Sequence, residues 1–281
     1  MPKVGDKIYP PYWDSIQENI DDVVIESSNP FDSDLWIDTV KDHQRNINFK
    51  RFVKNIVPFK KNNISEHLLL MIPLIDAIVR EKKICRIVDF GGGMGDNYSE
   101  IINYYGKKKI DKIEYNIIDT PNNCKMGEAM DKTKKINFIS NNPDAHKGVE
   151  IGDVISELHP DIVIICSTLQ CLYPYQELLL QFVKSHARYI YITRTPMTTS
   201  VPTFFCRQRI CPAVGRNKGL YLGDIKVTII NEEELSNFMS NNNYVERIKL
   251  FHSSNEASFS NFPSPYNEIF YKNYVFECGE L

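Results

Sequence analysis

One strand–turn–helix unit limits what this chain can fold into. The run ICRIVDF, residues 84–90, is short, apolar and β-branched, which is typical of a buried strand. It leads directly into the turn GGGMG, residues 91–95, and residues 96–106 follow with helical spacing and Asp96 as the expected N-cap. In open parallel sheets such a turn lets the backbone approach a ligand closely. We therefore expect an α/β fold with a ligand site at the end of this strand.

Strands and helices alternate along most of the chain. A helix capped by Asn231, with Glu234 in the position of a capping box, precedes two closing strands at 244–251 and 273–278. The five earlier strands are predicted at 84–90, 113–119, 135–140, 161–167 and 187–195. This pattern predicts a Rossmann-like seven-stranded sheet, with five parallel strands plus a closing pair that contains one antiparallel strand, and helices on both faces.

Two segments fall outside this alternation. Residues 1–63 are polar, contain both tryptophans and carry only short helical stretches, so we expect an N-terminal helical extension or lid on a domain spanning 64–281. Residues 196–223 are expected to form a long irregular insertion that overhangs the ligand, and loops of that length are usually functional. The length of 281 residues fits one elaborated domain or two.

Composition argues against several classes of protein. Lys and Arg number 33 against 36 Asp and Glu, a net charge of -3 without a basic stripe, so no nucleic-acid partner is expected. No run of about 18 apolar residues predicts a membrane span, and the first residues lack the features of a secretory signal. Seven cysteines without a C-x-x-C pair fit free thiols and no metal site. We expect a cytoplasmic protein.

The spacing of the glycines separates the cofactors that use such a turn. A dinucleotide fingerprint, G-x-G-x-x-G, needs a glycine three residues after Gly93, where Asp96 stands, and no other register fits. A phosphate-binding loop would need a Lys-Ser or Lys-Thr pair that is missing. The acidic form D-x-G-x-G-x-G remains, with Asp89, Gly91, Gly93 and Gly95 in register. A nicotinamide or flavin enzyme is thus disfavoured, and an NTPase more strongly so.

This turn resembles motif I of the class I S-adenosylmethionine-dependent methyltransferases. A strand-end carboxylate suits a ligand that carries an ammonium and a sulfonium. The resemblance implies that Asp119, which ends the second strand, accepts hydrogen bonds from ribose hydroxyls, that Ser140 and Asn141 lie near adenine, and that Ser167 borders both ligands. The cofactor-binding residues it implies are Asp89, Gly91, Gly92, Gly93, Gly95, Asp119, Ser140, Asn141 and Ser167. The alternative is that the glycines only form a tight turn and that Asp119 caps a loop.

A narrower resemblance rests on three short motifs. They are DFGGGMGDNY, CSTLQCLYPYQELL, and YIYITRTP followed by FFCRQRICPAV. Together they look like a group of methyltransferases found among bacterial genes for surface polysaccharides. The resemblance implies O-methylation of a sugar or glycan precursor, with a small-molecule or glycan-linked acceptor. A non-catalytic binding scaffold with the same fold, and a nicotinamide-dependent reductase, are the alternatives.

Methyl transfer requires the enzyme to position the acceptor and, for a hydroxyl, to remove its proton. His252 ends a predicted strand on the expected active edge and is a candidate general base. Gln170 and Tyr173 follow the fourth strand, where they could contact the acceptor or the sulfonium methyl. For Tyr173 the alternative is a packing role.

Arginines after the fifth strand form a second group of candidates. Arg194 emerges from the strand end, and Arg207 and Arg209 lie in the predicted insertion. Guanidinium groups bind both oxygens of a carboxylate or phosphate, so these three could hold an anionic group of the acceptor. The alternative is that they pair with acidic residues of the scaffold.

Overall fold

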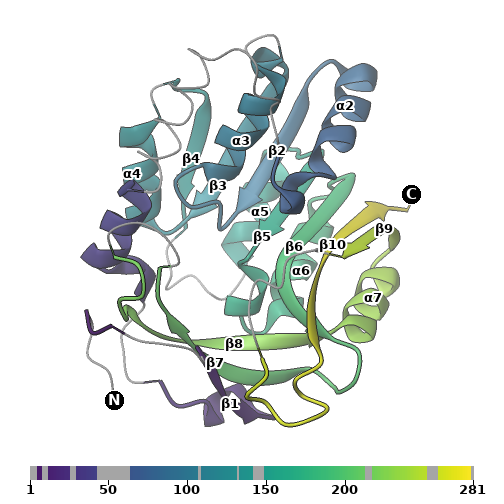
Figure 1. The fold of residues 1–281 in the computed structure, drawn as a ribbon. Helices are drawn as coiled ribbons and strands as arrows, with labels where there is room; N and C mark the ends of the chain where they lie inside the picture. The colour runs from purple at the N-terminus through teal and green to yellow at the C-terminus, as the bar shows by residue number, and fades with distance from the viewer. Residues whose placement is uncertain are drawn as a thin grey trace.

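In the described part of the chain, the computed structural model has ten strands with helices around them (Figure 1). It describes residues 5–7, 12–25, 30–42, 64–106, 109–131, 133–141, 149–212, 217–251 and 259–279. In Figure 1 a large central sheet carries helices on both sides, and a smaller group of strands crosses below it.

The sheet has ten strands where seven were predicted, and the seven predicted strands form its central part, which we call the central sheet. The parallel strands are β2 (Cys85–Phe90), β3 (Ile113–Asp119), β4 (Ile136–Ser140), β5 (Ile162–Cys166) and β6 (Tyr189–Thr198), in the order β4-β3-β2-β5-β6. Next to β6, β10 (Ile269–Cys278) runs antiparallel, and β9 (Tyr244–Phe251) pairs antiparallel with β10. The Rossmann-like class is therefore confirmed, and β10 is the one antiparallel strand among these seven, whereas the predicted strand count was too low by three.

Helices cover both faces because alternate side chains of the strands point to opposite sides. Ile87 of β2 packs in a core with α2 (Met71–Lys82), α3 (Asp96–Tyr105) and α4 (Pro121–Met130). Val88 and Phe90 face the other core, under α5 (Val149–Glu157), α6 (Tyr175–Lys184) and α7 (Glu232–Asn241). The short 3-10 turns are η1 (Ile20–Asp22), η2 (Pro30–Asp32), η3 (Glu66–Leu68), η4 (Ile110–Lys112) and η6 (Leu169–Cys171).

Two predicted caps differ in detail. The N-cap of α3 is Gly95, with φ +94°, and Asp96 is the first helical residue, so the prediction for Asp96 was wrong. Asn231 caps α7 as predicted, accepting from the N–H groups of Glu233 and Glu234 at 2.9 and 3.1 Å. The Glu234 carboxylate does not close a capping box, because it accepts a hydrogen bond from the Thr203 hydroxyl at 2.6 Å.

The predicted irregular insertion is instead largely a sheet. Strand β7 (Phe204–Ile210) lies between β8 (Gly223–Asn231) and β1 (Trp13–Gln17), antiparallel to both. Strand β8 joins the central sheet through a short parallel pairing with the end of β6. Trp13, Phe204, Cys206 and Val227 share a buried core on one face of this added sheet. The alternation of apolar residues at 204, 206 and 210 is the signal of a half-buried strand.

The N-terminal segment is attached to this added sheet. Besides β1, residues 34–42 form a helix. The Asn217 side-chain amide donates to the Leu35 carbonyl at 3.3 Å and to the Thr39 hydroxyl at 3.1 Å. We call the described residues 12–42 together with β7 and β8 the cap. No helix in the described ranges has the length and apolarity that a membrane crossing requires, and all seven cysteines are free thiols.

Candidate functional site

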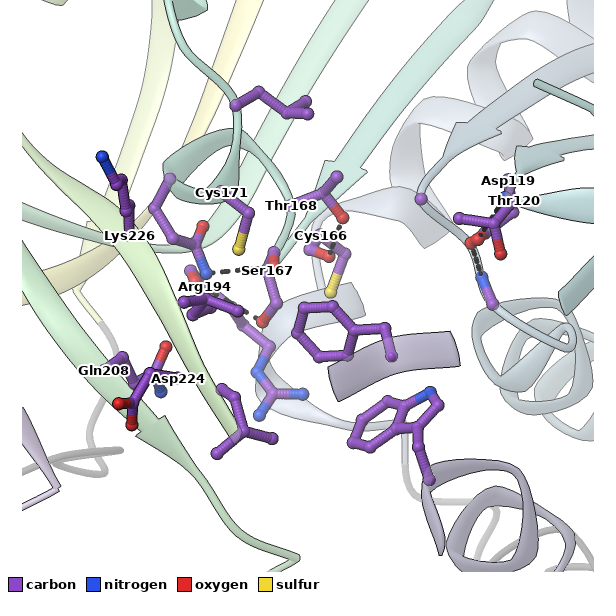
Figure 2. A pocket seen from close by; sticks show the side chains of 18 of the residues that line it. Asp119, Thr120, Cys166, Ser167, Thr168, Cys171, Arg194, Gln208, Asp224 and Lys226 are labelled. Atoms are coloured by element: carbon purple, nitrogen blue, oxygen red, sulfur yellow. Dashed lines mark hydrogen bonds between the residues drawn. The ribbon is translucent and has the colours of Figure 1, made fainter. Parts of the chain in front are cut away.

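A cavity of about 1710 Å³ lies at the carboxyl ends of the central strands, beneath the cap. Ligand pockets are commonly about 300 to 1,000 Å³, so this cavity has room for two molecules side by side. Figure 2 shows Asp119 and Thr120 at one side, Lys226, Gln208 and Asp224 at the other, and the end of β5 and the middle of β6 between them.

The glycine turn forms part of the wall and needs its glycines for different reasons. Gly91, Gly93 and Gly95 have φ values of +72°, +58° and +94°, where side chains cause strain. A Cβ on Gly91 would lie 2.2 Å from the Thr168 hydroxyl oxygen, and one on Gly95 would lie 2.8 Å from Ile136 Cδ1. A Cβ on Gly93 would meet no atom within 4 Å. Gly91, Gly92 and Gly93 line the cavity, whereas Gly95 packs the helix against the sheet.

Asp119 ends β3 beside this turn and lines the cavity. Its Oδ2 accepts a hydrogen bond from the Gly93 N–H at 2.7 Å. Its Oδ1 accepts from the Thr120 N–H at 2.6 Å and the Asn123 amide at 2.7 Å. A carboxylate has about four lone-pair positions, so one remains for a ligand hydroxyl. Two ligand hydroxyls would require the Gly93 bond to be given up.

Asp89 lies behind the glycine turn and not on the cavity wall. It is fully buried, and its Oδ2 accepts from the Tyr115 hydroxyl at 2.7 Å and the Asn97 amide at 3.1 Å. Burial raises its pKa to about 7, although these two hydrogen bonds oppose the rise. A Cβ on Gly92 would lie 2.6 Å from the Asp89 carboxyl carbon, so the carboxyl supports the turn from below.

The end of β4 contributes one of its two predicted residues. Asn141 lines the cavity, and its N–H donates to the Asp119 carbonyl at 2.7 Å. Ser140 is exposed and is not among the lining residues. Neighbouring residues of a strand point to opposite faces, which is why the structure brings only one of them to the site.

The end of β5 and the middle of β6 meet between the two halves of the cavity, because β6 continues past Arg194 to Thr198 and does not end near Thr195 as predicted. Ser167 and Arg194 both have left-handed backbones, with φ of +55° and +54°, and both line the cavity. The Ser167 N–H donates to the Thr193 carbonyl at 3.0 Å, and the Gln170 amide donates to the Ser167 carbonyl at 3.0 Å. Strained backbone of this kind concentrates at functional sites.

The structure thus brings three of the four predicted catalytic residues to the cavity. Gln170, Tyr173 and Arg194 line it, with Gln170 buried and Tyr173 54% exposed. The Tyr173 ring also packs edge-on against Phe205, with centroids 5.1 Å apart. His252 lies outside the described residues.

Arg207 and Arg209 contact a scaffold carboxylate, as the alternative interpretation expected. Arg207 holds Asp14 through two hydrogen bonds of 2.7 and 2.9 Å, and Arg209 lies 2.7 Å from the same carboxylate. Asp14 belongs to β1, so these pairs fix the N-terminal segment to β7.

Sequence reasoning missed the lining residues of the cap. They include Phe31, Trp36, Gln208, Asp224 and Lys226. Phe31 and Trp36 pack edge-to-face with centroids 5.0 Å apart. The alternating apolar residues of 204–210 could have identified β7, but the pairing of β1 with β7 joins segments some 190 residues apart and leaves no local signal.

The two halves of the cavity differ in charge. Asp96 and Asp119 line the half that contains the glycine turn. The half towards the cap has charges of both signs, from the cations Arg194, Arg209 and Lys226 and from the carboxylates Asp21 and Asp224. The first half suits a cationic ligand group, because carboxylates and cations attract more strongly where water is partly excluded.

No protein-family model matches this chain, and no curated protein matches it. Solved structures with a similar backbone include a 1,6-didemethyltoxoflavin-N1-methyltransferase of Burkholderia thailandensis with bound S-adenosylhomocysteine, at 10% identity and TM-score 0.44, covering 92% of this chain and 94% of that one. A methyltransferase of Clostridium acetobutylicum has 10% identity and TM-score 0.45, covering 83% and 99%. The CurJ carbon methyltransferase has 11% identity and TM-score 0.48, covering 76% and 54%.

Proposed function

We propose that this chain is an S-adenosylmethionine-dependent methyltransferase. The observation that carries the proposal is the glycine turn with its neighbouring carboxylates. Three left-handed glycines bend the backbone around the end of β2, and the Asp119 carboxylate is held 2.7 Å from the Gly93 N–H. Gly93 leaves open space above the turn, and Asp96 adds a second carboxylate to the wall.

These residues fit a cationic nucleoside ligand. The open space at Gly93 admits the body of the ligand, and the remaining lone pair of Asp119 suits a ribose hydroxyl. Asn141 and Thr120 offer further polar contacts along the same wall. The carboxylates complement the positive charge of the methyl donor, while a pyrophosphate would be repelled by them.

When bound, S-adenosylmethionine supplies a methyl group already activated by its sulfonium. The protein then has to hold the acceptor atom in line with that methyl and exclude water. Gln170 in η6 and Arg194 in the middle of β6 line the cavity and are the candidates for this positioning. His252 stays a candidate general base for a hydroxyl acceptor.

For the acceptor, we propose a hydroxyl of a sugar or glycan precursor. The support is the resemblance of the three motifs together with the size of the cavity, which has room for a second molecule beside the cofactor. Aromatic side chains such as Trp36 and Tyr173 line the wall, and flat rings of this kind pack well on the apolar faces of sugars.

Calorimetric titration tests the cofactor. S-adenosylhomocysteine should bind with micromolar affinity, whereas NAD(H) and NADP(H), as parallel titrants, should not bind. Replacing Asp119 by Ala should weaken S-adenosylhomocysteine by about 1 to 3 kcal/mol, the usual effect of removing a charged hydrogen-bond partner. Binding of a nicotinamide cofactor alone would indicate a reductase. Binding of S-adenosylhomocysteine without turnover of the methyl donor on any sugar nucleotide or glycan precursor would favour a scaffold.

A further inference from the structure

One face of the added sheet carries charged side chains from all three of its strands. In an antiparallel pair, directly opposite residues share a face. Asp14 of β1 lies opposite Arg207 of β7, which lies opposite Lys226 of β8. Arg209 and Asp224 are opposite one another on the same face, two residues along. We call these five residues the charged face.

The charged face has more cations than carboxylates. Three cationic side chains stand against two carboxylates, those of Asp14 and Asp224. Arg207 and Arg209 both contact Asp14 at 2.7 Å, and Arg207 lies 4.0 Å from Asp224. The two guanidiniums and the two carboxylates of this face cancel in charge, so Lys226 adds one excess positive charge.

Lys226 has a partner, but not an anionic one. Its ammonium donates to the Ile20 carbonyl at 2.9 Å, and within the described ranges no carboxylate forms an ion pair with it. An ammonium has three N–H donors, so two remain for a ligand. Lys226 is half-buried and lines the cavity, as does Arg194 in the middle of β6.

Lys226 lies on the side of the cavity away from the proposed cofactor half. Figure 2 shows it, with Gln208 and Asp224, across the end of β5 and the middle of β6 from Asp119. A cation at this place faces the second molecule and not the ribose. An ammonium in a partly desolvated wall costs free energy unless an anion pairs with it.

We propose that the methyl acceptor carries an anionic group, a phosphate or a carboxylate, and that Lys226 binds it at the charged face. The proposal rests on the proposed function, because the acceptor half is defined by where the cofactor sits. It makes Lys226 a specificity-determining residue and separates charged acceptors, such as a sugar phosphate or a sugar acid, from neutral sugars.

The test is calorimetric titration of the full chain saturated with S-adenosylhomocysteine. Inorganic pyrophosphate and succinate serve as separate probes. The probe that binds more tightly indicates whether the anionic group of the acceptor is a phosphate or a carboxylate. Lys226→Met should weaken the better probe about 10- to 100-fold, the range expected when a charged hydrogen-bond donor is lost. Lys226→Arg, which keeps the charge, should retain most of the affinity. Lys184→Met, on an exposed position of α6 outside the cavity, is the matched control and should bind like the wild type.

Each other outcome has a distinct meaning. If S-adenosylhomocysteine itself does not bind, the proposed function fails before the anion is tested. If it binds but neither probe does, or if Lys226→Met binds the probe as the wild type does, the anion site is refuted. A fall in S-adenosylhomocysteine affinity in a folded Lys226→Met protein would assign the ammonium to the cofactor and would also overturn the proposal. Should Lys226→Met fail to fold, Lys226→Gln takes its place.

Discussion

Alanine at Gly91 and at Gly93 should damage this protein in two different ways. Both residues have left-handed backbones, at φ +72° and +58°, so each substitution costs about 1 to 2 kcal/mol of backbone strain. At Gly91 the new Cβ would also lie 2.2, 2.5 and 2.8 Å from three atoms of the Thr168 side chain. The last of these is the Thr168 Cβ, which cannot move without its backbone. Overpacking of this kind adds about 1 to 3 kcal/mol.

The expected free energies of unfolding follow from these terms. Gly91→Ala should lose about 2 to 5 kcal/mol, and Gly93→Ala only about 1 to 2 kcal/mol, because its Cβ meets no atom within 4 Å. Urea unfolding of the ligand-free variants, followed by circular dichroism, measures both. Cofactor affinity should show the opposite order: Gly93→Ala should lose more affinity than Gly91→Ala, because the Cβ of Gly93→Ala projects into the cavity. Its affinity for S-adenosylhomocysteine should fall at least about tenfold, or 1.4 kcal/mol, in a protein that stays folded.

A third variant tests the cause of the larger loss. Adding Thr168→Ala to Gly91→Ala removes two of the three close atoms, so the double variant should recover part of the stability, and the two effects should not add. Equal losses at Gly91 and Gly93, or wild-type affinity of Gly93→Ala for S-adenosylhomocysteine, would refute this account of the turn.

Four further predictions concern charge and the cap. Glu232 and Lys272 are both 6% exposed and form an ion pair at 2.9 Å. Glu232→Gln should lose about 3 to 5 kcal/mol of stability in urea unfolding, because it leaves the Lys272 ammonium buried without its carboxylate. A loss under about 1 kcal/mol would contradict this. Burial works to raise the pKa of Glu232, but the hydrogen bonds from Lys249 and Lys272 outweigh it and lower the pKa. The stability of the wild type should therefore fall as pH drops below about 4.5, and Glu232→Gln should lack this part of the acid dependence. For Asp89 the pH dependence of stability should run the other way, because its pKa of about 7 in the folded protein lies above the unfolded value near 4 and the carboxylate takes up a proton on folding. Stability should therefore fall as pH rises from about 4 to 7. Asp89→Asn should flatten that slope in unfolding curves measured across this range. Both tryptophans line the cavity, but Trp13 is only 4% exposed and packs in the buried core of the added sheet, so S-adenosylhomocysteine or an acceptor should change tryptophan emission less in Trp36→Phe than in the wild type. An equal change in both proteins would assign the signal to Trp13.

The central sheet was predictable because its strands are buried on both faces. Such strands have continuous apolar sequences, and the strand predicted from IEYNIID at 113–119 is β3 with the same limits. The cap of α7 was predictable as well, since Asn231 satisfies two N–H groups from its own side chain. Glu234 could not be assigned in this way, because its partner Thr203 comes from another part of the chain.

The cofactor half was predictable in its residue types and less so in their directions. Asp89 shares the face of Ile87, which points to the core under α3, so its carboxyl reaches Tyr115 and Asn97 from beneath the turn. The same rule of alternation leaves Ser140 exposed while Asn141 lines the cavity. A motif defines which residues stand at a strand end, but a shift of one residue reverses the face that each presents.

The two halves of the cavity are specified by different kinds of information. The glycine turn depends on backbone angles within a few residues, so a short motif carries it. The wall opposite depends on β1, β7 and β8 meeting. Strand β1 is held there by its pairing with β7, by Trp13 in the buried core and by the Asp14 carboxylate between Arg207 and Arg209. Without Asp14 the two guanidiniums would lose the carboxylate that they share. The N-terminal segment therefore contributes to the wall of the proposed acceptor half, and substitutions in β1, β7 or β8 should alter this wall without disturbing the glycine turn.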